Sequence, residues 1–259
     1  MLITTLGDLL LDVVVRLEQP LVAGDDQVAV TRTGAGGQAA NVAAWAASLG
    51  AGARYVGKIG DDAAGKLVSA ELEELGVEIA GPRQGRTGVV VSLTSSGDRS
   101  MASDRGAAVD LSAEELDPAW FHADVLHVSG YALHREPLAG AAARAADLAR
   151  AHTAQVSLDI STWTLVDDDF RARVRALEPD VVFASERERA AVGDLETRWV
   201  LKHGRRGIAV DGRHYLARET TVVDATGAGD ALAAGFLVGG PELGLEAAAR
   251  CCAKLGSMP

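Results

Sequence analysis

Short runs of β-branched and aliphatic residues alternate with alanine-rich segments along most of the 259 residues of the chain. The runs that read as strands lie at residues 54–60, 124–130, 154–160, 180–185 and 198–204. The alanine-rich segments read as helices at 38–50, 63–76 and 137–152. This alternation is typical of βαβ units around a mainly parallel sheet, so it limits the fold to the α/β class. Sheets of this kind bind ligands where the strands end, at their carboxyl edge.

Residues 10–33 and 87–105 do not follow this alternation of strands and helices. Both stretches alternate polar and apolar residues, and a turn is expected at 95–98. We expect antiparallel strands outside the main sheet, arranged as a small β lid. The sequence shows no internal repeat, and a hydrophobic content of 48% is enough for a sizeable core. The prediction is therefore a single domain, residues 1–259, into which the lid strands are inserted.

The charge balance limits the partners. A net charge of −11 repels polyphosphate surfaces, which argues against binding of nucleic acid or of an anionic membrane. Any anionic ligand has to be held by local groups. Cys251 and Cys252 are the only cysteines and are adjacent, so no disulfide framework is expected. Asp8 and Asp12 interrupt the apolar N-terminal run, which fits neither a signal peptide nor a membrane span, and we expect a cytoplasmic protein.

A glycine-rich turn, DATGAGD at residues 224–230, leads directly into a helical segment. The N–H groups of Gly227, Ala228 and Gly229 and the positive end of the helix can bind an anion. Asp230 would face a resting pyrophosphate, so a dinucleotide site is disfavoured. A phosphoryl group in transfer fits better, with Asp230 as the general base that takes the proton of the attacking hydroxyl. Taken by itself, the motif is also compatible with an aspartate that only caps the helix.

Two separated segments resemble the signatures of one family. Residues 224–230 are similar to the C-terminal signature of the ribokinase, or PfkB, family of carbohydrate kinases. Residues 34–66, GAGGQAANVAAWAASLGAGARYVGKIGDDAAGK, are similar to its first signature. The resemblance implies a ribokinase-like three-layer αβα sandwich with a small β lid. It also implies ATP-dependent phosphorylation of a sugar hydroxyl, with Mg²⁺ as cofactor and K⁺ as a further candidate.

The resemblance assigns sugar-binding roles to four residues. Asp12 matches the aspartate that binds sugar hydroxyls, and Gly37 and Asn41 match the glycine and asparagine that hold the sugar at the start of a helix. A carboxylate accepts two hydroxyl hydrogen bonds, and an amide both donates and accepts them. Arg105 lies in a lid segment that contacts substrate in many members, where it would reach a polar or anionic substituent.

These residues leave two substrate classes open. Asp12 would repel a nearby carboxylate, so the buried end of the ligand is expected to be a neutral polyol. If Arg99 and Arg105 both face solvent, the substrate is a neutral pentose or hexose, and if one of them turns inward it is a sugar acid. We favour the neutral sugar, because the acidic protein as a whole would slow the capture of an anion.

The nucleotide and magnesium positions also follow from the resemblance. The segment VLKHGRRG is similar to the strand and loop beside ATP, which makes Lys202, Gly204 and Gly207 candidate contacts. In FASERERAAVG, Glu188 matches the glutamate that orients Mg²⁺ through water. Ser185, a further candidate contact, stands where the family has an asparagine and has a shorter reach.

For three further aspartates the resemblance implies a less specific role. Asp224 matches a position associated with a monovalent-cation loop, and its oxygens suit K⁺, although it can equally cap the loop. Asp61 and Asp62 belong to a G-x-x-G-x-D-x-x-G run at residues 57–65 and are expected to fix turn geometry.

The expected partners are a small-molecule sugar and ATP, and a homodimer formed through the lid. The lid strands would otherwise leave an apolar face in water. Two alternatives within the family are a nucleoside kinase and a keto-deoxy sugar acid kinase, and the aromatic content of 4% offers little for stacking a nucleobase. A third alternative is a catalytically impaired relative that only binds sugar or nucleotide, which the serine at position 185 suggests.

Overall fold

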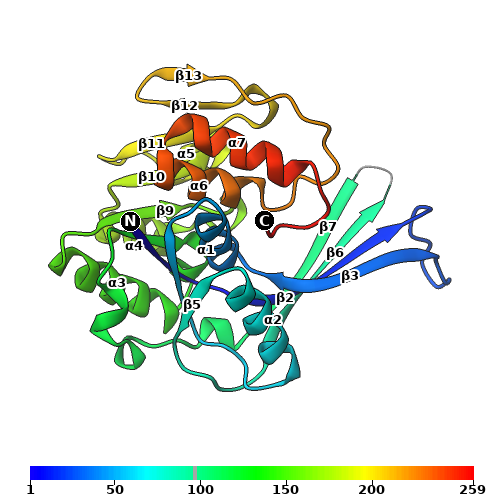
Figure 1. Cartoon of the computed structure of the whole chain (residues 1–259), viewed down its shortest axis with the longest axis horizontal. Coiled ribbons are helices and arrows are strands. Elements are labelled where there is room, and N and C mark those ends of the chain that lie inside the picture. Colours follow the sequence, from blue (N-terminus) through cyan, green and yellow to red (C-terminus); the bar gives the residue numbers. More distant parts are fainter. Residues whose placement is uncertain (96–97) are drawn as a thin grey trace.

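The computed structural model describes residues 1–95 and 98–259 and contains two β-sheets (Figure 1). The expected turn at 95–98 is centred on residues outside this description, and the side chain of Arg99 also lies outside it. The main sheet has the strand order β13-β12-β11-β10-β9-β8-β1-β4-β5. Its strands are β1 (Leu2–Leu6), β4 (Gly52–Val56), β5 (Val77–Ala80), β8 (Val125–Ser129), β9 (Gln155–Asp159), β10 (Val181–Ser185), β11 (Arg198–Lys202), β12 (Ile208–Val210) and β13 (Arg213–Tyr215).

The seven neighbouring strands β5, β4, β1, β8, β9, β10 and β11 run parallel in the described sheet. Strands β12 and β13 are antiparallel additions at one edge. The α/β class expected from the alternation is therefore confirmed. Each of the five runs read as strands overlaps a strand of this sheet. Because neighbouring parallel strands end at one edge, the residues that follow β1, β8, β9, β10 and β11 come together there.

Helices cover both faces of the main sheet. One face carries α1 (Gln38–Ser48), α2 (Ala63–Glu74), α6 (Ala228–Gly239) and α7 (Pro241–Cys252), and the other carries α3 (Leu138–Ala151), α4 (Asp168–Leu177) and α5 (Glu186–Val192). Short 3₁₀ turns lie at Ala107–Val109, Ala113–Glu115, Pro118–Phe121, Gly130–Leu133, Trp163–Leu165 and Gly204–Arg206. The sheet thus separates two apolar cores, as in a three-layer sandwich.

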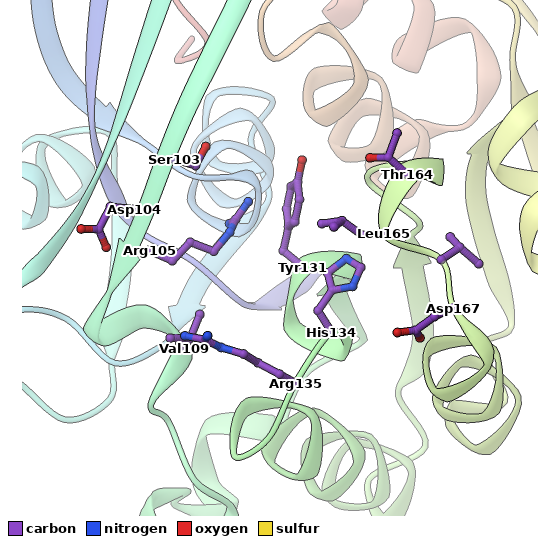
Figure 2. A pocket seen from close by; sticks show the side chains of 11 residues that line it. Ser103, Asp104, Arg105, Val109, Tyr131, His134, Arg135, Thr164, Leu165 and Asp167 are labelled. Carbon is purple, nitrogen blue, oxygen red and sulfur yellow. The ribbon is translucent and has the colours of Figure 1, made fainter.

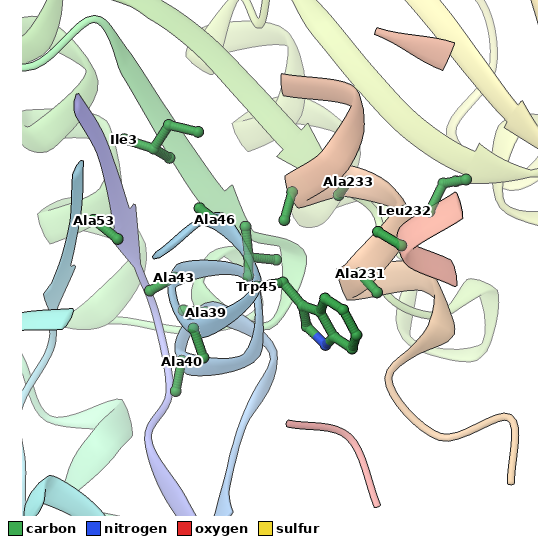
Figure 3. Packing of buried hydrophobic residues seen from close by; sticks show 14 of the residues in the cluster. Ile3, Ala39, Ala40, Ala43, Trp45, Ala46, Ala53, Ala231, Leu232 and Ala233 are labelled. Atoms are coloured by element: carbon green, nitrogen blue, oxygen red, sulfur yellow. The ribbon is translucent and has the colours of Figure 1, made fainter. Parts of the chain in front are cut away.

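Helices α1 and α6 pack closely against one another. The buried face of α1 is mostly alanine, and small side chains let two helix backbones approach. Figure 3 shows the ring of Trp45 from α1 beside Ala231 of α6. The indole N–H of Trp45 donates to the carbonyl of Ser257 at 2.8 Å. This packing brings the N-terminal ends of α1 and α6 to the same place at the sheet edge.

The lid is a four-stranded sheet that extends away from the main body (Figure 1). Its strands are β2 (Leu10–Leu17), β3 (Ala29–Gly36), β6 (Thr87–Ser95) and β7 (Asp98–Gly106), in the order β3-β2-β6-β7. The expectation of antiparallel strands is wrong for the central pair, since β2 and β6 are parallel. Both strands leave the main body in the same direction and are the first strands of their hairpins, so the two hairpins meet in parallel.

Asp62 ties the lid to the main body. Its carboxylate caps α2 by accepting from the N–H of Gly65 at 2.8 Å, and it also accepts from the N–H of Thr87 at 2.9 Å at the start of β6. The hydrogen bond from the Thr87 hydroxyl is the largest cause that lowers the pKa of Asp62, and the backbone N–H donors add to it. This is the turn geometry expected for the run at 57–65. Within the described residues, no helix combines the length and apolarity that a membrane crossing requires.

Candidate active site

Asp230 lies in the first turn of α6, at the carboxyl edge of the main sheet. The turn before it depends on glycine. Gly227 has φ 76°, and a Cβ built there would lie 2.6 Å from the Cβ of Ser257. A side chain at this position would therefore be strained and would also clash. The N–H groups of the first helical turn point out of the helix end together with its positive dipole.

The carboxylate of Asp230 is held by Asn41 of α1. The amide nitrogen of Asn41 donates to Asp230 Oδ2 at 2.7 Å, and its oxygen accepts from the Ser257 hydroxyl at 3.0 Å. Burial raises the pKa of Asp230 to about 7, with a further rise from the charge of Asp159, against the lowering effects of Asn41 and Lys202. A carboxylate with a pKa near neutrality is suited to take a proton from a hydroxyl at physiological pH.

Lys202, at the end of β11, places a partly buried ammonium beside the glycine turn. Its Nζ donates to Asp159 at 2.8 and 3.0 Å and lies 3.8 Å from Glu188 Oε2. A Cβ built on Gly229 would lie 3.8 Å from the same Nζ. Burial lowers the pKa of Lys202, but the charges of Asp159 and Glu188 raise it above its usual value. The lysine therefore stays protonated next to the N-terminus of α6.

Asp159 is a site residue that sequence analysis missed. It is the last residue of β9 and is almost fully buried. The signal was available, because Asp159 lies near the C-terminal end of the run at 154–160, at the sheet edge where ligands bind. An aspartate at the carboxyl end of a strand in a parallel sheet is therefore a candidate site residue.

Arg105 turns inward from the lid rather than toward solvent. Its guanidinium pairs with the buried carboxylate of Asp8 and lies 3.7 Å from the ring centroid of Tyr131. Asp8 also accepts from the backbone N–H of Gln38 at 3.1 Å. Sequence analysis used Asp8 only against a signal peptide or a membrane span, although it lies two residues after the first strand of the sheet. The stack of Arg105 on Tyr131 joins the lid to the segment after β8.

The backbone around Asp12 and Gly37 is closely packed against neighbouring atoms. A Cβ on Gly36 would come within 2.1 Å of the Asp12 carboxyl carbon, and a Cβ on Gly37 would lie 2.4 Å from the carbonyl oxygen of Asp8. Asp12 lines a cavity of about 230 Å³ together with Arg32 and residues near the C-terminus. Arg105 lines a different cavity, so the predicted sugar-binding residues do not share one cavity.

The candidate nucleotide contacts line a cavity of about 470 Å³. Lys202, Gly204 and Gly207 lie on its wall together with Gly229 and residues of α7. Gly207 has φ 96°, and a Cβ there would lie 1.9 Å from the carbonyl oxygen of Tyr215, so the loop needs glycine. The structure thus brings three of the four predicted nucleotide contacts together beside the glycine turn.

The fourth predicted nucleotide contact, Ser185, forms a capping box with Glu188 at the start of α5. The Ser185 N–H donates to Glu188 Oε2 at 2.6 Å, and the Glu188 N–H donates to the Ser185 hydroxyl at 3.3 Å. Asp224 has a comparable local role. It accepts from the N–H of Thr226 at 2.9 Å and from the N–H of Gly256 at 3.1 Å. These contacts give both positions a structural explanation.

The donor set fits a magnesium ion that arrives with its nucleotide. Across the described residues, no group of three or more acidic, histidine or cysteine side chains could hold a metal ion. Two carboxylates, Asp159 and Glu188, nevertheless lie next to the ammonium of Lys202. Mg²⁺ usually keeps several waters and binds through one or two carboxylates and the substrate phosphates. The site therefore suits Mg²⁺ held largely by ATP and water.

Comparisons with known proteins agree with this description of the fold. The family model described as "pfkB family carbohydrate kinase" matches residues 2–258. A structure described as a ribokinase from Thermotoga maritima superposes with a TM-score of 0.80 at 22% identity, which shows a ribokinase-like fold. The chain belongs to the PfkB family of carbohydrate kinases and is therefore an ATP-dependent kinase of sugars or nucleosides.

Individual relatives cover most of the chain. It is 33% identical to an ATP-dependent ribose-1-phosphate kinase of Halopiger xanaduensis over 93% of this chain and 86% of the relative. It is also 33% identical to a fructokinase of Escherichia coli over 82% of this chain and 78% of the relative. The crystal structure of adenosine kinase from Sinorhizobium meliloti superposes with a TM-score of 0.87 at 26% identity, covering 99% of this chain and 95% of that one.

Proposed function

We propose that this kinase transfers the γ-phosphoryl group of ATP to a sugar hydroxyl, as a ribokinase or fructokinase does, with Asp230 as the general base. The observation that carries the proposal is the position of Asp230, at the N-terminus of α6 and with a pKa raised to about 7. Asp230 removes the proton of the sugar hydroxyl as the hydroxyl oxygen attacks the γ-phosphorus. The bond between the γ-phosphorus and the bridging oxygen breaks, and ADP leaves with the electron pair.

The turn of Gly227, Ala228 and Gly229 acts in this proposal as the anion hole. Its N–H groups and the positive end of α6 stabilise the charge on the phosphoryl oxygens during transfer. Lys202 supports the same step, because its ammonium lies beside Gly229 and is fixed by Asp159. When bound with ATP, Mg²⁺ would neutralise part of the phosphate charge.

The remaining roles follow the family resemblance. Asp12, Gly37 and Asn41 hold the sugar, and Arg105 contacts it from the lid. Ser185, Lys202, Gly204 and Gly207 contact the nucleotide, Glu188 orients Mg²⁺ through water, and Asp224 shapes a loop that binds a monovalent cation such as K⁺. The shared cavity of Lys202, Gly204 and Gly207 supports the nucleotide assignment. The hydrogen bond between Asn41 and Asp230 supports a sugar position in reach of the base.

The relatives differ in the charge of the sugar that their names give. Fructose is neutral, whereas ribose 1-phosphate carries a phosphate. Similarity to the adenosine kinase of Sinorhizobium meliloti supports a nucleoside as the second candidate. Against a nucleoside, one face of the Tyr131 ring is already covered by Arg105. A purely binding relative has no need of a base at the anion hole, and Asp230 is present.

The test is an ATP-turnover assay over neutral pentoses and hexoses, keto-deoxy sugar acids, sugar phosphates and nucleosides. ADP release that depends on a sugar, with the phosphorylated sugar identified by mass spectrometry, is the expected result. Release that depends only on nucleosides would replace the proposal by the second candidate. The absence of acceptor-dependent ADP release across the whole panel would contradict both.

A further inference from the structure

A cavity of about 680 Å³ lies between β7 of the lid and the segments that follow β8 and β9. Figure 2 shows that Arg105, His134 and Arg135 line it, together with Tyr131. Apolar side chains, among them Val109 and Leu165, form part of its wall. The proposed roles of the site residues leave His134 and Arg135 without a function. The cavity therefore combines an apolar wall with three nitrogen-bearing side chains.

The acidic side chains of this cavity already have partners. Asp104 accepts from Arg86 at 2.6 Å and from the N–H of Gly106 at 3.0 Å. Asp167 caps α4 by accepting from the N–H of Phe170 at 2.8 Å. Both carboxylates are thus directed at protein donors. In the part of the chain that the structure describes, neither carboxylate forms an ion pair with Arg105 or Arg135, although the charge of Asp167 raises the pKa of His134 against the stronger lowering by burial and Arg105.

The two arginines of the cavity differ in whether a carboxylate neutralises their charge. Arg105 is paired with Asp8 at the inner side of the cavity. Arg135 is exposed, and among the described residues no carboxylate lies within ion-pair distance of it. A guanidinium in this state can form a bidentate pair with a ligand oxyanion without first breaking an internal ion pair.

His134 adds an unsatisfied donor or acceptor. Within the described structure, its Nε2 atom is buried and has no hydrogen-bond partner. The ring is held in place by stacking on Phe170, with ring centroids 4.9 Å apart, and Arg173 donates to the His134 carbonyl at 2.7 Å. A buried polar atom without a partner is costly. Nε2 has almost no accessible surface, so a ligand oxygen in the cavity becomes its acceptor only after a small shift of the ring. Burial and the charge of Arg105 lower the pKa of His134, so the ring would bind as a neutral donor.

The cavity adjoins the proposed reacting centre through Arg105, which lines it and pairs with Asp8. Asp8 accepts from the N–H of Gln38 in the first turn of α1, and Asn41 of the same turn donates to Asp230. Burial raises the pKa of Tyr131, the charge of Arg105 lowers it, and the charges of Asp8 and Asp230 raise it further. Tyr131 therefore lies in the electrostatic field of both the proposed base and the lid arginine. A substrate whose hydroxyl reaches Asp230 would extend its distal group past this stack of Arg105 on Tyr131.

We propose that this cavity is a subsite for an anionic group, a phosphate or a carboxylate, on the distal end of the sugar substrate. Arg135 and His134 bind the anion, and Arg105 lies at its inner edge. The proposal rests on the proposed function and specifies its substrate class. The sequence led us to expect a sugar acid if one of the lid arginines turned inward, and Arg105 does so.

The first experiment compares kcat/KM at saturating ATP for ribose 1-phosphate and 2-keto-3-deoxygluconate with that for ribose and fructose. We expect one anionic sugar to exceed both neutral sugars by about 100-fold, because charge-assisted hydrogen bonds to a guanidinium are strong. A preference for ribose 1-phosphate identifies phosphate as the group, and a preference for the keto-deoxy acid identifies carboxylate. A neutral sugar used as well as either anion overturns the subsite and leaves the proposed function standing.

Substitutions then assign the effect to the cavity. Arg135→Gln is expected to reduce the ratio of anionic to neutral kcat/KM by about 10- to 100-fold, mainly through KM. His134→Phe keeps an aromatic ring on Phe170 but removes Nε2, and should reduce the ratio by a smaller factor. Arg144→Gln, at an exposed position of α3 outside the cavity, is the matched control and should leave the ratio unchanged. An unchanged ratio in both cavity variants would overturn the proposal.

A binding measurement separates the subsite from the chemistry. If no sugar is phosphorylated, the proposed function fails, and calorimetric titration of ribose 1-phosphate, 2-keto-3-deoxygluconate and ribose into the same protein decides the subsite. Tighter binding of an anionic sugar than of ribose, weakened by Arg135→Gln, supports it. Equal binding of the three probes, or none at all, overturns it.

Discussion

Asn41 donates a hydrogen bond of 2.7 Å to Asp230 across 189 residues of sequence. The bond joins the first turn of α1 to the first turn of α6, and these two helices begin within the two segments that resembled family signatures. It also lowers the pKa of a carboxylate that burial raises. The contact therefore couples the proposed sugar-binding end of α1 to the proposed base.

Asp230→Asn is expected to lower kcat by about 10²–10⁴-fold, the usual contribution of a positioned general base, while sugar and ATP bind nearly as before. Since burial disfavours the ionised carboxylate, the variant should melt at or above the temperature of the wild type at pH 8. Steady-state kinetics and thermal melts check both statements. Glu246→Gln, at an exposed position in the middle of α7, is the control and should change neither. Retention of most activity in Asp230→Asn would remove the base assignment.

The fold and part of the site followed from local sequence patterns. The strands and helices around the sheet were readable because apolar periodicity is a local property, and the glycine turn with Asp230 carries its own geometry. The pairing of β2 with β6 was not readable, because it depends on how two hairpins leave the body. The contacts of Arg105 with Asp8 and of Lys202 with Asp159 span long stretches of chain, so only the tertiary structure brings them together.

The pH dependence of turnover should report the ionisation of Asp230. Because the base acts as a carboxylate, activity is expected to rise with pH through about 7, the pKa of Asp230. Asn41→Ala removes a hydrogen bond that favours the ionised form, so the midpoint should move to higher pH. Profiles of kcat against pH for both proteins measure this shift. A midpoint that stays in place, or falls, in Asn41→Ala would contradict the coupling.

The same raised pKa has a consequence for stability. The folded protein keeps the Asp230 proton above pH 4, where the unfolded chain has lost it, so the free energy of unfolding should fall as pH rises from about 4 to about 7. Asp230→Asn removes this contribution. Urea unfolding at several pH values should therefore show the wild type losing stability relative to the variant as pH rises over this range. Parallel curves for the two proteins would argue against a raised pKa in the folded state.

Asp159→Asn tests whether the buried carboxylate positions Lys202. The amide cannot balance the ammonium, so Lys202 should lose its fixed place beside Gly229, and kcat is expected to fall by about 10- to 100-fold. Asp159 also raises the pKa of Asp230, so the midpoint of the pH profile should move to lower pH. A purely structural role would lower stability without moving that midpoint. Asp147→Asn, on the exposed face of α3, serves as the control.

The last prediction concerns the outer face of the lid. Strand alternation puts Val13, Val15, Val91 and Leu93 on one face, where the cross-strand pairs Val13–Val91 and Val15–Leu93 lie in register and are only partly buried. A second copy of the lid would cover this face, so we expect a homodimer at micromolar concentration.

Val15→Asp places a charge in the middle of that face and should convert the dimer to a monomer, as measured by light scattering. Val30→Asp makes the same change on the opposite face of the lid, where Val30 is 60% exposed, and should leave the mass unchanged. If the wild type is monomeric at these concentrations, the lid does not pair. If both variants dissociate equally, the dimer does not depend on this face in particular, because a charge on either side of the lid then disturbs it.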